Sequence, residues 1–284
     1  MRYSFIVAEG SHDIEVLAQI LKSYSLERIT KNSERKLDPY WSDLITSKLP
    51  SKEKENKSSK KSNEEESGNK KNNEDLIQPV RLPTFLQNDQ LSVALHNAGG
   101  ESQLAKTISE NLSILPVTST ISGIGIILDA DTIKSPNERF KSCIKELTKR
   151  NLTQLQSSLP SSPGVVTKGS VRCGIFVIPD NSSQGTLEDI LMECAERNYP
   201  DLLKRSRNYI DNINTSLLTE EDLKEFQKSA GKNKAIISGI TSILKPSKSL
   251  VVSLQHNRWV DEETLKLDRL VAIRNFVGEI VGAL

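Results

Sequence analysis

Residues 119–132, with the sequence S-T-I-S-G-I-G-I-I-L-D-A-D-T, constrain the fold more than any other stretch of this chain. The apolar run from Ile124 to Leu128 is typical of a strand buried on both faces of a parallel sheet. It ends at Asp129 and Asp131, and side chains two residues apart point the same way in an extended chain. Because ligands of open α/β sheets bind at the carboxyl ends of the strands, we expect both carboxylates side by side at a binding edge.

Two carboxylates held this close repel each other unless a cation lies between them. Clustered carboxylate oxygens are the ligands that suit Mg²⁺ or Mn²⁺. The D-x-D pattern therefore indicates a metal site. A helix cap or a turn explains the same pattern equally well, since Asp is favoured at both.

The N-terminus repeats this arrangement of a buried strand followed by acids. Residues 5–8 are apolar, and Glu9 and Gly10 follow them, with Gly10 suited to a tight turn. An amphipathic helix comes next and carries Asp13 in its first turn. The sequence thus predicts two strand ends with two carboxylates each.

A third apolar strand is predicted at Cys173 to Ile178, and the alternation of strands with helices predicts an α/β fold with a mostly parallel sheet. After it, Thr186 is suited to cap a helix whose first turn contains Glu188 and Asp189. The helix dipole favours acids at this position, so the residues alone favour capping over catalysis for Glu188.

Four motifs in this order resemble the Toprim domain, the module of topoisomerases, primases and small nucleases. They are A-E-G-S-H-D at 8–13, I-I-L-D-A-D-T at 126–132, G-T-L-E-D-I-L at 185–191 and G-K-N-K-A-I-I-S-G-I at 231–240. The last two are similar to segments of nucleases of the OLD (overcoming lysogenisation defect) family. The resemblance covers the chain except roughly residues 45–78. Ala8 replaces the more usual Val, and the insert after Leu49 lies outside the common core.

The resemblance implies a Toprim-like fold and a Mg²⁺- or Mn²⁺-dependent nuclease that hydrolyses phosphodiester bonds of DNA or RNA. Glu9 would also act as general base or acid. Lys234 would stabilise the transition state, with Lys232 as the alternative, because spacing alone does not separate the two lysines. The implied metal ligands are Glu9, Asp13, Asp129 and Asp131, and the implied catalytic residues are Glu9, Glu188 and Lys234.

The resemblance also bears on partners. In OLD-like systems the nuclease domain works with an ATPase, and this sequence has no G-x-x-x-x-G-K-[ST] motif, so the ATPase would be a separate subunit, for instance in anti-phage defence. A topoisomerase would need a tyrosine nucleophile on a large second domain, and a primase a zinc ribbon; neither is found. The alternative function is a degenerate Toprim module that binds a partner or nucleic acid without cutting it.

Composition excludes several other classes. The chain has 38 basic and 37 acidic residues, so net charge indicates no polyanion partner. Three cysteines without C-x-x-C spacing indicate neither a disulfide framework nor a zinc site. No stretch approaches the roughly 20 apolar residues of a membrane span, and no signal peptide is recognised, so we expect a cytoplasmic protein. His12 lies in the carboxylate turn, where a histidine more often faces solvent than takes part in catalysis.

The predicted organisation is a Toprim-like core at 1–190 and a helical C-terminal region at 191–284 that completes the fold. Within the core, an insert at 50–76 is predicted to be disordered: residues 51–75 carry seven Lys and seven acids and no apolar side chain. Helices are predicted around 190–212, 219–230, 233–244 and 262–284, the last with Leu284 on its apolar face. The basic face of the helix that follows Asp131 is predicted to be solvated.

Overall fold

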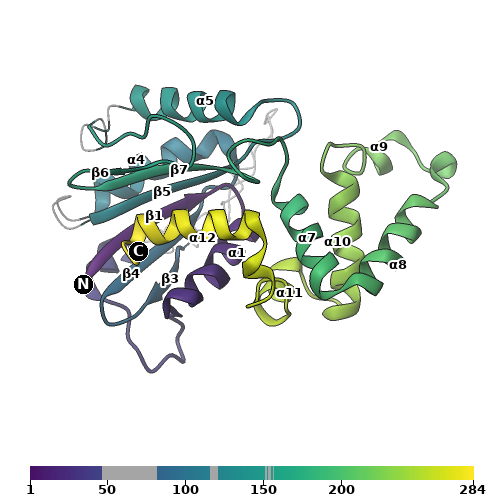
Figure 1. The fold of residues 1–284 in the computed structure, drawn as a ribbon, viewed down its shortest axis with the longest axis horizontal. Coiled ribbons are helices and arrows are strands. Elements are labelled where there is room, and N and C mark those ends of the chain that lie inside the picture. Colours follow the sequence, from purple (N-terminus) through teal and green to yellow (C-terminus); the bar gives the residue numbers. More distant parts are fainter. Residues whose placement is uncertain (47–81, 116–120, 151, 153–154, 156) are drawn as a thin grey trace, which may run out of the picture.

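The protein is described by a computed structural model, which covers residues 1–46, 82–115, 121–150, 152, 155 and 157–284. The described residues form one seven-stranded sheet with helices on both faces, and a group of helices extends beyond one end of the sheet (Figure 1). The α/β fold predicted from the sequence is therefore confirmed. The insert predicted at 50–76 lies outside the described residues.

The sheet has the strand order β2-β3-β4-β1-β5-β7-β6. Its strands are β1 (Arg2–Ala8), β2 (Glu27–Arg28), β3 (Thr84–Gln87), β4 (Leu91–Asn97), β5 (Ile121–Asp129), β6 (Val166–Lys168) and β7 (Arg172–Ile178).

The four central strands β4, β1, β5 and β7 are parallel, as the apolar runs in β1, β5 and β7 predicted. β1 lies between β4 and β5, pairing Val7 with Ile126, and β5 pairs in turn with β7. β2, β3 and β6 are short antiparallel strands at the edges, and none of them was predicted. Because the central strands run the same way, their carboxyl ends meet at one edge of the sheet.

The helices are α1 (Ser11–Leu21), α2 (Ser42–Thr46), α4 (Leu104–Ile114), α5 (Pro136–Lys149), α7 (Leu187–Asn198), α8 (Pro200–Asp211), α9 (Glu220–Leu223), α10 (Gly231–Leu244), α11 (Leu250–His256) and α12 (Asp268–Val281). Short 3₁₀ turns occur at Lys22–Tyr24, Pro39–Trp41, Glu101–Gln103, Thr215–Leu217 and Thr264–Lys266.

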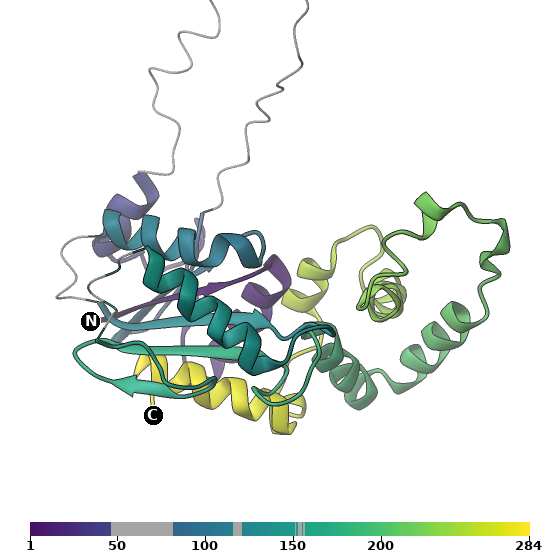
Figure 2. The ribbon, with the colours of Figure 1, turned by 90° about the horizontal axis from the view of Figure 1, so that it is seen from above.

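Two apolar cores lie on opposite faces of the sheet. On one face, β1 contributes Phe5 and Val7, which pack in a cluster with α4 and α5. On the other face, Ile6 and Ala8 join a cluster formed by α1, α12 and the remaining C-terminal helices. This alternation along β1 is expected of a strand buried on both sides. Figure 2 shows the sheet between the two helical layers.

Glycines in the sheet allow α12 to lie close to the strands. A Cβ atom built on Gly123 of β5 would lie 2.0 Å from the carbonyl oxygen of Ile280 in α12, and one on Gly174 of β7 would lie 2.6 Å from the ring of Phe276. Only glycine fits at such contacts. The C-terminal helix therefore packs directly against the sheet.

The remaining C-terminal helices form a lobe beside the carboxyl edge of the sheet, made of α7, α8, α9 and α10 (Figure 1). The helix boundaries predicted there are partly wrong. The chain turns at Tyr199 and Pro200 between α7 and α8, because a proline ring fits only the first turn of a helix. The predicted helix at 219–230 is reduced to α9, and α11 was not predicted. Leu284 lies beyond α12 and is 71% exposed, so its assignment to an apolar face is wrong.

Within the part of the chain that the structure describes, no helix is long and apolar enough to cross a membrane.

Candidate active site

Glu9 and Asp129 meet at the carboxyl edge of the sheet. Glu9 directly follows β1, Asp129 is the last residue of β5, and these two strands are adjacent and parallel. The backbone N–H of Asp129 donates a hydrogen bond to Oε1 of Glu9 at 3.2 Å. The structure thus brings together two carboxylates that are 120 residues apart in the sequence.

Asp13 lies in the first turn of α1, where it is 8% exposed. The N–H of Gly10 donates to its Oδ2 at 2.7 Å, so part of its role is to cap the helix. Burial nevertheless raises the pKa of Asp13 to about 7, and the nearby carboxylates of Glu9 and Glu188 act in the same direction. Asp13 therefore belongs to the same electrostatic cluster as Glu9.

Asp129 is the centre of this cluster. Burial raises the pKa of Asp129 well above its ordinary value, and Asp13, Glu9 and Glu188 raise it further. Its Oδ1 accepts a hydrogen bond at 3.1 Å from the N–H of Leu187, in the first turn of α7. Three carboxylates, one just after β1, one on α1 and one on α7, thus oppose the ionisation of Asp129 at the end of β5. We call Glu9, Asp13, Asp129 and Glu188 the carboxylate cluster.

Glu188 enters the cluster from α7, where its side chain is 7% exposed. Thr186 caps this helix through a capping box with Asp189, so the cap predicted there is confirmed, while Glu188 itself faces the other carboxylates. Nζ of Lys234 on α10 lies 3.8 Å from Oε1 of Glu188. Nζ of Lys232 instead pairs with Oδ1 of Asp211 on α8 at 2.7 Å. Of the two lysines, the structure places Lys234 at the cluster.

Asp131 lies at the margin of the cluster. β5 ends at Asp129, and Asp131 has a φ of 66°, so the strand alternation expected for the D-x-D pair does not extend to it. Its Oδ1 accepts from the N–H of Thr132 at 2.7 Å and from the hydroxyl of Ser229 at 3.2 Å. Its charge still contributes to raising the pKa of Glu9, after burial and Glu101. Asp131 therefore joins the edge of the sheet to the segment that precedes α10.

Arg139 is a site residue that the sequence analysis missed. The basic face of α5 was predicted to be solvated, which is wrong here: the Arg139 side chain is 5% exposed. It donates from Nη2 to Oε1 of Glu9 at 3.1 Å and from Nε to the carbonyl oxygen of Asp129 at 2.7 Å, and it also pairs with Glu101. The sequence contains one signal for this role of Arg139: the residue lies near the start of the helix that follows Asp131.

His12 lies next to the pair formed by Glu188 and Lys234. Burial lowers the pKa of His12, the Glu188 charge opposes this shift, and the Lys234 charge adds to it. The imidazole is therefore favoured in its neutral form at pH 7. Gly99 and Gly100 form the turn that follows β4, and their N–H groups donate to the carbonyl oxygen of Glu9 at 3.0 and 2.9 Å.

The donor chemistry of the carboxylate cluster fits Mg²⁺ or Mn²⁺, which prefer carboxylate oxygens. A divalent cation would also remove the repulsion that raises the pKa values of Asp13 and Asp129. As the described side chains stand, however, no group of three or more His, Cys, Asp and Glu residues could hold a metal ion. Metal binding at the cluster therefore requires its side chains to close around the ion.

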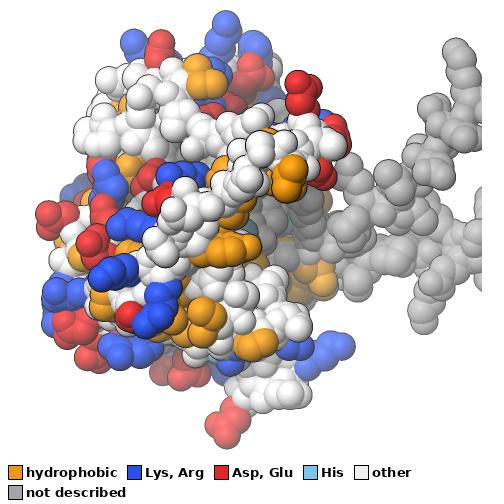
Figure 3. All heavy atoms as spheres, turned by 90° about the vertical axis from the view of Figure 1, so that its right-hand side faces the viewer, with side chains coloured by type: hydrophobic (Ala, Val, Ile, Leu, Met, Phe, Trp, Pro, Cys, Tyr) orange, Lys and Arg blue, Asp and Glu red, His pale blue; other side chains and the backbone are white. Residues whose placement is uncertain are grey.

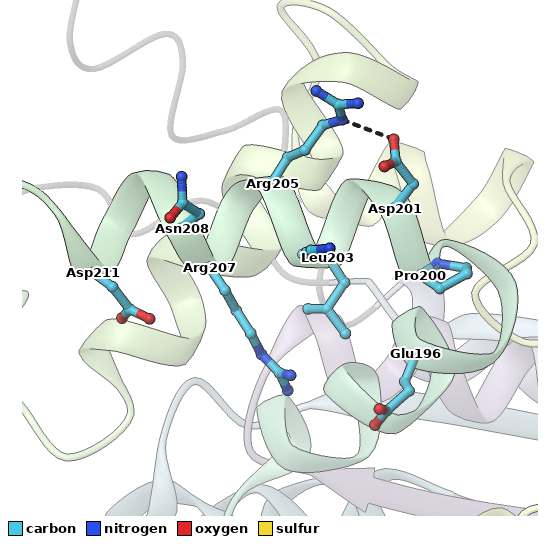
Figure 4. Close-up of a pocket in the computed structure, with 9 residues that line it drawn as sticks. Glu196, Pro200, Asp201, Leu203, Arg205, Arg207, Asn208 and Asp211 are labelled. Carbon is cyan, nitrogen blue, oxygen red and sulfur yellow. Dashed lines mark hydrogen bonds and ion pairs between the residues drawn. The ribbon is translucent and has the colours of Figure 1, made fainter.

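A hollow lined by residues of α7 and α8 lies away from the cluster. It has a volume of about 710 Å³, and Figure 4 shows that its wall carries both signs of charge, with Arg205 paired to Asp201 at 2.8 Å. Figure 3 shows blue and red side chains intermixed over this end of the molecule. The hollow has no segregated charge that would select a ligand.

The raised pKa of Asp13 predicts how stability depends on pH. An Asp with a pKa of 3.8 when unfolded and about 7 when folded stabilises the folded state fully below pH 4, and this contribution is lost as the pH rises to about 7. We expect metal-free protein to lose roughly 3–4 kcal/mol of unfolding free energy over this range from Asp13. Urea denaturation in EDTA at pH 4 and pH 8 measures the loss, and Asp13→Asn serves as the control. Equal pH dependence in both proteins would contradict the prediction.

Residues 3–274 match the family model described as "Protein of unknown function (DUF3226)". No curated protein matches the chain. The crystal structure of the hypothetical protein PH0156 from Pyrococcus horikoshii OT3 is similar, with a TM-score of 0.51 and 13% identity, over 99% of this chain and 95% of that one. At this identity the similarity extends to the fold alone. Neither description names an activity, so the Toprim resemblance stays a prediction.

Proposed function

The chain belongs to the DUF3226 family, and from its carboxylate cluster we propose that it is a metal-dependent nuclease that hydrolyses phosphodiester bonds of DNA or RNA. The observation that carries the proposal is the convergence of Glu9, Asp13, Asp129 and Glu188 at the carboxyl edge of the parallel sheet, with Lys234 beside them. Buried acids that raise one another's pKa cost stability, and such an arrangement is typical of a functional site.

The position of each residue in the site suggests its role. Glu9, Asp13, Asp129 and Asp131 would hold Mg²⁺ or Mn²⁺, which supplies a nucleophilic water at neutral pH and charge stabilisation at phosphate oxygens. The raised pKa of Glu9, which burial causes, makes its carboxylate a better proton acceptor than an ordinary glutamate. Lys234 is 62% exposed and ends at the cluster, so it can reach a phosphate that approaches from solvent.

The partners and compartment follow from the same proposal. Nucleic acid is the substrate, and the mixed charge of the surface leaves the cluster and its metal as the means of attracting it. A separately encoded ATPase subunit would regulate the nuclease, as in OLD-like anti-phage defence, and the reaction would take place in the cytoplasm.

The experiment that tests the proposal offers the purified protein a panel of plasmid DNA, single-stranded DNA and tRNA with Mg²⁺, Mn²⁺ or EDTA. We expect cleavage of at least one substrate with metal and none with EDTA. Calorimetric titration with Mn²⁺ provides a readout that does not depend on activity or on a regulatory partner. Absence of both cleavage and Mn²⁺ binding would overturn the proposal.

A second function is supported by the ion pairs of the site. Arg139 already pairs with Glu9, and Lys234 with Glu188, so cations of the chain itself compensate two of the four acids. This arrangement favours the alternative of a degenerate module that binds nucleic acid or a partner without cutting it. Binding of the same nucleic-acid panel with equal affinity in Mn²⁺ and in EDTA, and no cleavage, would identify this function.

The two lysines of α10 offer a matched pair of variants. We expect Lys234→Ala to lower the cleavage rate about a hundredfold, because a positive charge aimed at the developing oxyanion is removed. Lys232→Ala serves as the control: it removes the same charge from the same helix, but its Nζ pairs with Asp211 instead. Single-turnover cleavage rates measure both effects. Equal losses in the two variants would assign the effect to net charge rather than to the site.

A further inference from the structure

A second charged cluster lies at the opposite end of the sheet, where the central strands begin. Arg2 is the first residue of β1, Arg172 is the first residue of β7, and Lys168 is the last residue of β6. They line a hollow of about 480 Å³ together with the carboxyl end of α12. β1 separates this end from Glu9 by seven residues, which is about 20 Å of extended chain. Figure 1 shows this end beside the labels of both termini.

The three cationic side chains lie close to one another rather than to acidic side chains. Lys168 and Arg172 are directly opposite in the antiparallel ladder of β6 and β7, a position where like charges destabilise a sheet. A Cβ atom built on Gly282 would lie 2.8 Å from Nη1 of Arg2 and 2.9 Å from Nη2 of Arg172, so both guanidinium groups pack against this residue. Burial lowers the pKa of Arg172, and the charge of Arg2 lowers it further.

The described residues supply little compensation for these charges. No carboxylate among them lies within the 4.0 Å of an ion pair to Arg2, Lys168 or Arg172, and Glu279, which also lines the hollow, forms none. Arg2 donates to the carbonyl oxygen of Gly282 at 2.7 Å and Arg172 to that of Ile280 at 2.9 Å. The end of a helix carries only about half a negative charge, which cannot neutralise three cations.

One donor remains without any partner. Nη2 of Arg172 is buried and donates to no acceptor among the described residues, although a buried guanidinium nitrogen left unpaired is costly. Capping of α12 accounts for one bond of each arginine and leaves their other donors unused. An anion in the hollow would pair with those donors of Arg2, Lys168 and Arg172 that reach it and would remove the repulsion among the three cations.

We propose that Arg2, Lys168 and Arg172 form a binding site for a phosphate dianion, separate from the carboxylate cluster. The side chains that line the hollow, three cations and Glu279, have a formal charge of +2 in sum, which suits an anion such as a phosphate monoester. The volume exceeds that of a phosphate group alone and is in the range of small-molecule sites, so a nucleoside monophosphate fits the same chemistry. The site does not depend on the proposed nuclease activity.

The test measures binding of inorganic phosphate and of AMP to the full chain by calorimetry, in EDTA and at constant ionic strength set with chloride. We expect saturable binding of at least one probe, weakened about tenfold by Lys168→Glu, because one charge-assisted hydrogen bond is replaced by repulsion. Lys168 is exposed and makes no other contact that would unfold the protein when lost. Tighter binding of AMP than of phosphate would identify a nucleotide as the source of the phosphate.

Two controls make the result decisive. Lys248→Glu changes net charge equally on an exposed loop far along the chain and should leave binding unchanged. Asp129→Asn should also leave it unchanged, because that residue lies at the other end of β5. The proposal is overturned if neither probe binds saturably, or if Lys168→Glu and Lys248→Glu weaken binding to the same extent.

Discussion

Asp129→Asn is expected to lower Mg²⁺-dependent phosphodiester cleavage about a thousandfold while making the metal-free protein more stable at pH 8. The loss of activity follows from the central position of Asp129 among the carboxylates that would hold the metal. The gain in stability follows from its pKa, which burial and the charges of Asp13 and Glu9 raise well above the ordinary value. A neutral amide removes the repulsion and can still accept the hydrogen bond from the N–H of Leu187.

The sign of the stability effect depends on pH. An acid whose pKa is raised by folding stabilises the folded state below its unfolded pKa and ceases to do so as the pH passes its folded pKa. We therefore expect Asp129→Asn to raise the unfolding free energy at pH 8 and to have little effect near pH 4. Urea denaturation in EDTA and single-turnover cleavage in Mg²⁺ provide the two measurements on the same samples.

Asp89→Asn is the matched control, because Asp89 is 87% exposed and pairs only with the surface residue Arg35. It should change neither cleavage nor stability by a measurable amount. If Asp129→Asn loses stability as well as activity, the Asp129 carboxylate stabilises the fold, as a member of a structural ion pair does. An active Asp129→Asn would remove the residue from the proposed mechanism.

Much of the central sheet could be predicted from the sequence because β1, β5 and β7 each contain a run of apolar residues that ends at an acid or a turn. Glu9 and Asp129 are an example. They lie at the ends of neighbouring strands, and the order of the strands alone brings their carboxylates to one edge of the sheet. The antiparallel edge strands escaped prediction because β2, β3 and β6 have only two to four residues each, too few for a periodic signal.

Features that depend on packing between distant elements could not be predicted in the same way. Lys232 and Lys234 are two residues apart on α10, and only the packing of α10 against α7 and α8 decides which one faces Glu188. The sequence likewise does not show why position 123 is a glycine, because the reason is the close packing of α12 against it. The turn at Pro200, by contrast, had a signal in the sequence, since proline ends the helix that precedes it.

Arg139→Met is expected to lower the free energy of unfolding by about 3 kcal/mol, because the Arg139 side chain is 5% exposed and holds three groups together. Its loss leaves Glu9, which is 19% exposed, without its cationic partner, and leaves the carbonyl oxygen of Asp129 without the donor at 2.7 Å. The Arg139 charge lowers the pKa of Glu9 against the effect of burial, so the variant should raise that pKa further.

The pH dependence separates the two roles of Arg139. If Glu9 must be ionised to bind metal, Arg139→Met should move the lower limb of the cleavage profile to higher pH, whereas a purely structural arginine would lower stability and leave the profile in place. Arg139→Lys keeps the charge but not the forked geometry that reaches Glu9, Glu101 and Asp129 together, so it should restore the profile more fully than the stability. Unchanged stability of Arg139→Met would contradict the buried network from which both expectations derive.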